Sequence, residues 1–189
     1  MENIENSYIN KLYYESVYNL RNIEENIQMV VLSMIGFFLP FVLGHPQILV
    51  GIIINASLIL GATYLKGHKI LPLILLPSVG VLTAGILFGT YTSFLLYLIP
   101  FIWLGNAVYV YVYKYFNVTE HKLKNNFLGL GIASIAKAAL LFGVTFLLVQ
   151  FAIVPSVFLT AMGLLQLTTA LIGGVVAVSI VKGREKFNS

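Results

Sequence analysis

The stretch Phe127–Phe151, FLGLGIASIAKAALLFGVTFLLVQF, decides the fold. A helix needs about 20 apolar residues to cross about 30 Å of hydrocarbon, and this run is longer than that. Its apolar residues are continuous and do not alternate with polar ones, which favours a transmembrane helix over a strand of a membrane barrel. Lys137, near its middle, is the one charged residue in the run.

The rest of the chain has the same character. Of the 189 residues, 59% are hydrophobic and 10% are charged, whereas soluble domains carry about 25% charged residues. We therefore expect an all-α membrane protein with six transmembrane helices. The predicted spans cover residues 27–43, 47–65, 70–88, 92–113, 127–150 and 156–181. The pairs Gly85/Gly89, Gly129/Ala133 and Ala170/Gly174 predict close contacts between helices.

The basic residues predict the orientation of this bundle. With six spans, the N-terminus, the loops at 66–69 and 114–126, and the C-terminus all lie on one side. That side carries ten of the 11 Lys and Arg residues, and Lys137 is the remaining one. Because positive charge marks the cytoplasmic side, we expect both termini to be cytoplasmic and the protein to be a multi-pass protein of the plasma membrane. The net charge of +4 follows from this topology and gives no reason to expect nucleic-acid binding.

The chain divides into three predicted parts: a cytoplasmic N-terminal segment over 1–28, the transmembrane domain over 29–182 and a cytoplasmic tail over 183–189. Apolar residues of the first part recur at helical spacing between charged ones, which predicts an amphipathic helix. This helix either leads into the first span or docks on a partner. No basic stretch precedes a short apolar core, so a signal peptide is not expected.

Lys137 has no acidic partner within the apolar sequence. All seven acids are glutamates, and none lies between Glu25 and Glu120 or between Glu120 and Glu185. A charged side chain at the centre of a bilayer costs at least about 2.5–3.5 kcal/mol. Three interpretations remain open: hydrogen bonds to carbonyls and to Asn106 or Gln166, an anionic ligand, or an acid of another subunit.

Other polar side chains fall at a similar depth. Asn106 and Gln166 lie within about a turn and a half of the bilayer centre, as Lys137 does, and such groups usually face the bundle interior. We therefore expect Lys137, Asn106 and Gln166 to line one pocket. Trp103 or Tyr97 would stack on a ligand there, and Thr169 is a further candidate. Asn106 and Gln166 also suit plain hydrogen bonds between helices.

Several reaction classes lack their residues. The chain has no Asp and no Cys, and His45, His68 and His121 all fall in predicted loops. No metal site, no cofactor and no enzymatic activity are therefore expected. Transport coupled to protons or sodium usually needs acids within the spans, and the sequence has no phosphate-binding loop for ATP.

Two runs carry a resemblance to a known family. The third span and the turn after it, with Pro77, Gly80, Gly85 and Gly89, together with the run PFIWLGNA at 100–107, resemble the substrate-binding S component of energy-coupling factor (ECF) transporters. The resemblance implies a vitamin- or micronutrient-binding subunit with an outward-facing pocket. It also implies docking, through small residues of the first helix, on a transmembrane T component driven by two ATPases.

These expectations combine into one hypothesis. The chain would be a substrate-binding subunit in which Lys137 meets an anionic group of a small ligand. Ser33 and Gly36, the small residues that the first span offers, would contact the T component. The alternative is a membrane anchor or assembly subunit whose Lys137 pairs with an acid of a partner chain.

Overall fold

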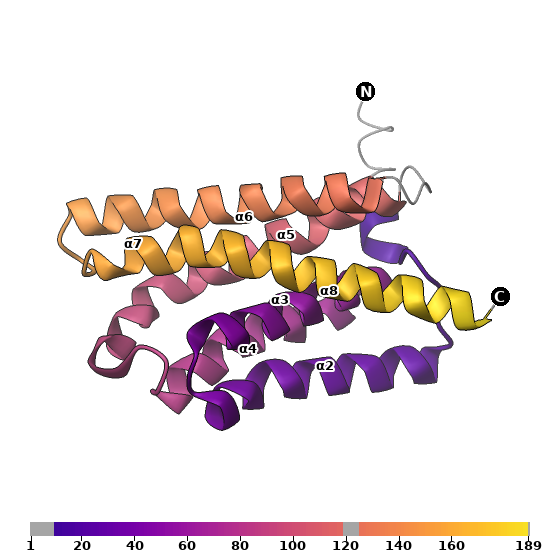
Figure 1. Cartoon of the computed structure of the whole chain (residues 1–189), viewed down its shortest axis with the longest axis horizontal. Coiled ribbons are helices and arrows are strands. Elements are labelled where there is room, and N and C mark those ends of the chain that lie inside the picture. The colour runs from indigo at the N-terminus through magenta and orange to yellow at the C-terminus, as the bar shows by residue number, and fades with distance from the viewer. Residues whose placement is uncertain (1–9, 119–124, 189) are drawn as a thin grey trace.

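The fold is a bundle of long helices that run side by side (Figure 1). The structure is a computed structural model and describes residues 10–118 and 125–188. Within these residues it contains helices and no strand, and six helical segments are long and apolar enough to cross a membrane. The chain is therefore a multi-pass membrane protein, as the composition predicts.

The helical elements follow one another closely along the chain. They are α2 (Asn22–Leu43), α3 (Gln47–Tyr64), η1 (Gly67–Ile70), α4 (Leu71–Ala84), η2 (Gly89–Phe94), α5 (Leu95–Val118), α6 (Asn125–Gln150), α7 (Val157–Met162) and α8 (Leu164–Asn188). The first four spans are joined by connections of only two to four residues. The third and fourth spans begin with the short 3-10 segments η1 and η2, and the sixth consists of α7 and α8.

Several predicted spans differ in detail from the observed ones, and the fourth extends to Val118 and not to residue 113. The third helix ends at Ala84 and not at residue 88, because Gly85 adopts a left-handed backbone with φ 68°. Gly89 also has a positive φ, and nothing lies within 4 Å of the position that a Cβ would take at either glycine. The prediction that Gly85 and Gly89 form a helix contact is therefore wrong, since both serve the turn. The sixth span, which is predicted as one continuous helix, is broken at Gly163.

The N-terminal segment is less regular than a single amphipathic helix. Residues 1–9 lie outside the described part, residues 10–14 are helical, and residues 15–21 are not. Helix α2 begins at Asn22, inside the predicted 1–28 segment. Its first turn is stabilised by Arg21, whose backbone N–H and Nη2 donate to the Glu24 carboxylate at 3.2 and 2.6 Å.

Small residues set the spacing of the helices, as their pattern predicts elsewhere in the chain. A Cβ at Gly80 would clash with the Phe37 backbone, and one at Gly173 would clash with the backbone at Ile52. A side chain at Gly174 would overlap Leu130. These contacts bring α4 against α2, and α8 against α3 and α6.

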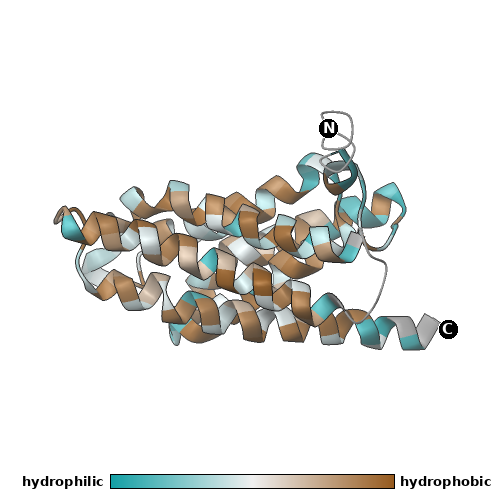
Figure 2. Cartoon of the chain, turned by 90° about the horizontal axis from the view of Figure 1, so that it is seen from above, coloured by the Kyte–Doolittle hydropathy of each residue, from teal (hydrophilic) through white to brown (hydrophobic). Residues whose placement is uncertain are grey.

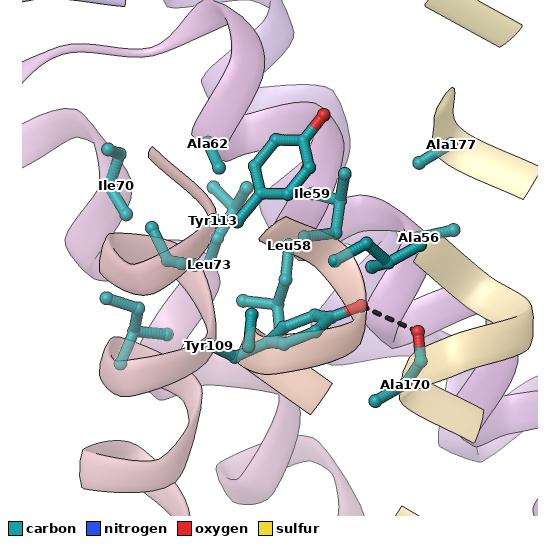
Figure 3. Packing of buried hydrophobic residues seen from close by; sticks show 14 of the residues in the cluster. Ala56, Leu58, Ile59, Ala62, Ile70, Leu73, Tyr109, Tyr113, Ala170 and Ala177 are labelled. Carbon is teal, nitrogen blue, oxygen red and sulfur yellow. Dashed lines mark hydrogen bonds between the residues drawn. The ribbon is translucent and has the colours of Figure 1, made fainter. Parts of the chain in front are cut away.

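The main core lies where α3, α4, α5 and α8 meet (Figure 3). Tyr109 is its largest fully buried aromatic side chain, and its hydroxyl donates to the Ala170 carbonyl at 2.7 Å. The bond joins α5 to α8 across the bundle. A second cluster around Leu98 and Phe158 packs the opposite end, where the Phe88 and Phe158 rings stack at 5.2 Å.

The two ends of the bundle differ in charge. The basic end comprises residues 10–21, the α3–η1 connection and the end of α8, which lie together (Figure 1). The neutral end comprises the α2–α3 connection, residues 85–94 and residues 150–157. Figure 2 shows hydrophobic residues along most of the helices and hydrophilic ones concentrated towards the end that holds the C-terminus. All described Lys and Arg residues except Lys137 lie towards the basic end, including Lys69 in η1 and Lys114 near the end of α5, which donates to the Leu65 carbonyl.

Candidate functional site

A cavity of about 90 Å³ lies inside the bundle between α3, α4, α5, α6 and α8. It extends from Lys137 towards Gln47, Leu87 and Phe88 at the neutral end. Its walls are mostly apolar. The polar lining residues are Gln47, Asn55, Ser78, Asn106, Lys137 and Gln166. The sequence therefore predicts correctly that Lys137, Asn106 and Gln166 line one pocket.

Lys137 enters the cavity from α6, and the side chain is almost fully buried, with 2% of the residue exposed. Its Nζ donates to the Asn55 side-chain oxygen at 2.6 Å and lies 5.1 Å from the centre of the Tyr109 ring. An ammonium group has three N–H donors, and one is used in the Asn55 bond. No salt bridge to Lys137 forms within residues 10–118 and 125–188.

Asn55 holds the lysine in place. Its Nδ2 donates to the Gly51 carbonyl at 2.9 Å and to Thr169 Oγ1 at 3.2 Å, so its oxygen is turned to Lys137. Thr169 in turn donates to the Leu165 carbonyl at 2.7 Å. Thr169 thus supports Asn55 and does not line the cavity. Sequence reasoning missed Asn55 as the partner of Lys137, although an amide in an otherwise apolar span was the available signal.

Asn106 and Gln166 do not bond to Lys137, contrary to one interpretation of the sequence. Asn106 is buried, and its Nδ2 donates to the Ile74 carbonyl at 3.1 Å, which ties α5 to α4. The Gln166 side-chain oxygen is buried and has no hydrogen-bond partner among the described residues. A buried carbonyl without a donor costs about 1–3 kcal/mol, so this oxygen marks a place for a donor from outside the chain.

The break between α7 and α8 lies beside the cavity. Gly163 has φ −99° and ψ −92°, donates to the Leu159 carbonyl at 2.9 Å and accepts from Leu167 at 3.0 Å. The first amides of a helix have no partner within the helix, and here they belong to the turn that carries Gln166. Non-helical backbone at membrane depth is tolerated where it lines a cavity, and Met162 and Gln166 on either side of the break both line this one.

Two predicted aromatic residues lie away from the cavity lining. Trp103 Nε1 donates to the Leu75 carbonyl at 3.1 Å and to Ser78 Oγ at 2.7 Å, so the indole ties α5 to α4. Tyr97 is 56% exposed on the outside of the bundle. Neither residue is placed to stack on a ligand in the cavity, because neither is among the lining residues.

Ser33 and Gly36 face α4. Ser33 is buried, and a Cβ added at Gly36 would lie 3.0 Å from Pro77 Cγ. Both positions therefore pack inside this chain in the described state, and contact with a T component stays a prediction. The exposed side of α2 consists of larger apolar residues such as Val31, Met34 and Phe38.

The basic end contains a second buried polar cluster, and its charges are paired. Glu25 is 3% exposed and accepts hydrogen bonds from the Lys66 backbone N–H at 2.7 Å and from Lys69 Nζ at 2.8 Å. Lys114 is fully buried, donates to the Leu65 carbonyl at 3.3 Å and is close enough to interact electrostatically with Glu25. Within the described residues, no group of three His, Cys, Asp or Glu side chains is placed to hold a metal ion.

Comparison of this chain with models of protein families, with curated proteins and with solved structures finds no match.

Proposed function

We propose that this protein is the substrate-binding subunit of a membrane importer and that its cavity receives a small anion. The observation that carries the proposal is Lys137: a buried ammonium, lining a cavity, with no acid among the described residues around it. One of its three donors is used, so an anion in the cavity would complete both its charge and its hydrogen bonds.

The direction of the cavity supports uptake from outside the cell. It extends towards the neutral end, which the positive-inside rule assigns to the outer side of the plasma membrane. The termini and the basic end are then cytoplasmic. A substrate would enter between Gln47 and the segment at Leu87 and Phe88.

Coupling to energy would come from other chains. The cavity contains one cation and amides but no acid that could bind a proton or sodium ion, and the sequence has no phosphate-binding loop. This agrees with the role that the ECF resemblance implies, in which a T component and two ATPases drive the substrate-binding subunit. The chain itself would catalyse no reaction.

The size of the cavity favours a small ligand over a vitamin. Sites for drug-sized ligands have volumes of about 300–1,000 Å³. The cavity of about 90 Å³ is several times smaller than such sites. A vitamin would enter only if the helices moved apart, whereas a small carboxylate fits without that movement.

The alternative function, a membrane anchor whose Lys137 pairs with a partner's acid, has less support. Lys137 faces an internal cavity and is 2% exposed, so a partner side chain would have to pass between helices to reach it. A diffusible anion meets no such barrier.

Anion binding by the purified protein in nanodiscs tests the proposal. Calorimetry would compare small carboxylates with their neutral amides, for the native protein and for Lys137→Met. We expect carboxylates to bind, amides to bind at least about tenfold more weakly, and Lys137→Met to lose the preference. Lys114→Met, which removes the other fully buried lysine, is the control and should keep it. Equal carboxylate affinity in native protein and Lys137→Met would contradict the anion site.

Association with other subunits is tested separately. The tagged chain, purified from its native membrane, should bring down a transmembrane protein together with ATPase subunits. Recovery of one stable partner without ATPases would favour the anchor.

A further inference from the structure

The cavity contains an acceptor as well as a cation. The Gln166 side-chain oxygen is buried, lines the same cavity as Lys137 and has no donor among the described residues. An unmet carbonyl oxygen requires an N–H or O–H group. A ligand that only accepts hydrogen bonds, such as a simple carboxylate, would satisfy Lys137 and leave Gln166 unmet.

The ligand group that donates to the Gln166 oxygen should be electrically neutral. The described lining residues include no Asp or Glu, so a ligand ammonium would find no counter-charge in the cavity. It would also be repelled by Lys137 in a medium where charges are weakly screened. A hydroxyl group donates to the Gln166 oxygen without this penalty.

The walls require carbon in the ligand. Val50, Ile54, Leu95, Ile99 and Ile102 form much of the lining. A phosphate or sulfate ion presents oxygen in every direction, and each oxygen against these side chains would lose its water without gaining a donor. A carboxylate with a short carbon attached places its oxygens at one end and its carbon against the wall.

We propose that the cavity binds a small 2-hydroxy carboxylate, with the carboxylate on Lys137 and the hydroxyl donating to the Gln166 oxygen. The proposal rests on the proposed function, because it assumes that Lys137 receives an anion. A volume of about 90 Å³ favours the smallest acid of this class, so glycolate is the matching probe.

Three two-carbon acids differ at one position and test the inference. Glycolate carries a hydroxyl there, acetate carries hydrogen and glycine carries an ammonium group. Their affinities would be measured by calorimetry on the full chain in nanodiscs, with dihydrogen phosphate as a fourth probe. Gln166→Leu removes the acceptor, and Gln150→Leu makes the same change at an exposed position at the end of α6. Thermal melting of each variant shows that it is folded.

We expect glycolate to bind at least about tenfold more tightly than acetate, glycine or phosphate, because a site built around a hydroxyl discriminates strongly against analogues that lack it. Gln166→Leu should bring glycolate and acetate to within about twofold of each other, and Gln150→Leu should leave their ratio unchanged. Equal binding of glycolate and acetate by the native protein would contradict the proposed hydroxyl contact with Gln166 while leaving the anion site intact. Tighter binding of glycine or phosphate would overturn it as well. If the native protein bound none of these anions, the proposed function itself would be contradicted.

Discussion

The two buried lysines of this bundle have opposite surroundings. Lys114, at the basic end, bonds to the Leu65 carbonyl and lies near the Glu25 carboxylate. Lys137, beside the cavity, bonds to a neutral amide and lies over a tyrosine ring. Both residues are almost fully buried, so burial alone does not distinguish them. The difference lies in the available counter-charge, which the chain supplies at one site and omits at the other.

The polar groups around the two lysines have different partners. At the basic end Glu25 in α2 bonds to Lys69 in η1 and to the backbone of Lys66 in the α3–η1 connection. The charges there hold the helices together. At the cavity the polar groups hold Lys137 in position but leave its charge uncompensated. A site that only fastened helices would gain from an acid, and its omission fits a site that exchanges its counter-ion.

The largest expected effect comes from removing the partner of Lys137. Asn55→Leu takes away the oxygen that accepts from Nζ and leaves a buried ammonium without a hydrogen bond. Leaving a buried polar group without its hydrogen-bond partner costs about 1–3 kcal/mol, and more when that group is charged, so we expect a loss of at least about 3 kcal/mol. Chemical unfolding in mixed micelles would measure the free energy of unfolding.

The double variant Asn55→Leu with Lys137→Met provides the control. Because no charge is then left behind, it should be clearly more stable than Asn55→Leu alone. If both variants lost equal stability, Asn55 would act through α3 packing and not through the lysine.

The corresponding change at the basic end should cost less. Glu25→Gln removes the negative charge but keeps an oxygen that can accept from the Lys66 backbone N–H. Loss of the charge-assisted bond to Lys69 should lower the free energy of unfolding by about 1.5–3 kcal/mol. Glu24→Gln, at the neighbouring partly exposed position, weakens only a surface pair with Arg21 and should cost far less stability. A similar loss for both substitutions would mean that Glu25 contributes no more than a surface charge.

Much of this arrangement could be predicted from sequence because it follows from solvation. Long apolar runs must form helices in a bilayer, and six such helices are observed. The one-sided distribution of Lys and Arg predicts their orientation in the membrane, which stays a prediction. Polar side chains at membrane depth usually face the bundle interior, and this rule predicts one cavity for Lys137, Asn106 and Gln166. All three line the observed cavity.

The parts that sequence reasoning missed depend on helix rotation and on backbone detail. Trp103 and Asn106 are three residues apart on α5, yet only Asn106 lines the cavity, and the indole bonds to α4. The sequence analysis does not identify Asn55 as the partner of Lys137, since depth along a span does not say which residue lies opposite. Glycines in membrane helices commonly serve helix packing. Only the backbone angles show that Gly85 forms a turn and that Gly163 breaks a helix.

The turn after α4, at the neutral end, depends on the left-handed backbone of Gly85 and not on charge pairs. Gly85→Ala places a Cβ at φ 68° with nothing nearby, so its cost is the left-handed conformation alone, about 1–2 kcal/mol. Gly143→Ala, in the middle of α6 and also without neighbours at the new Cβ, should be neutral or slightly stabilising. Thermal melting of the two variants compares them directly. Equal melting temperatures would show that the turn after α4 adapts to alanine.

The smallest expected change in stability is at Lys137 itself, and it separates structure from function most sharply. Methionine has nearly the length of lysine and no charge, and replacing buried charged groups with apolar ones of similar volume is often neutral or stabilising. We expect Lys137→Met to melt within a few degrees of the native protein, since Asn55 keeps its bonds to Gly51 and Thr169. Lys114→Met should melt lower, because it leaves the Glu25 charge with one cation fewer. Such a result for Lys137→Met would mean that Lys137 does not serve the stability of the fold, as the proposed anion site requires. Marked destabilisation by Lys137→Met would instead make the lysine a structural residue of the α3–α6 contact.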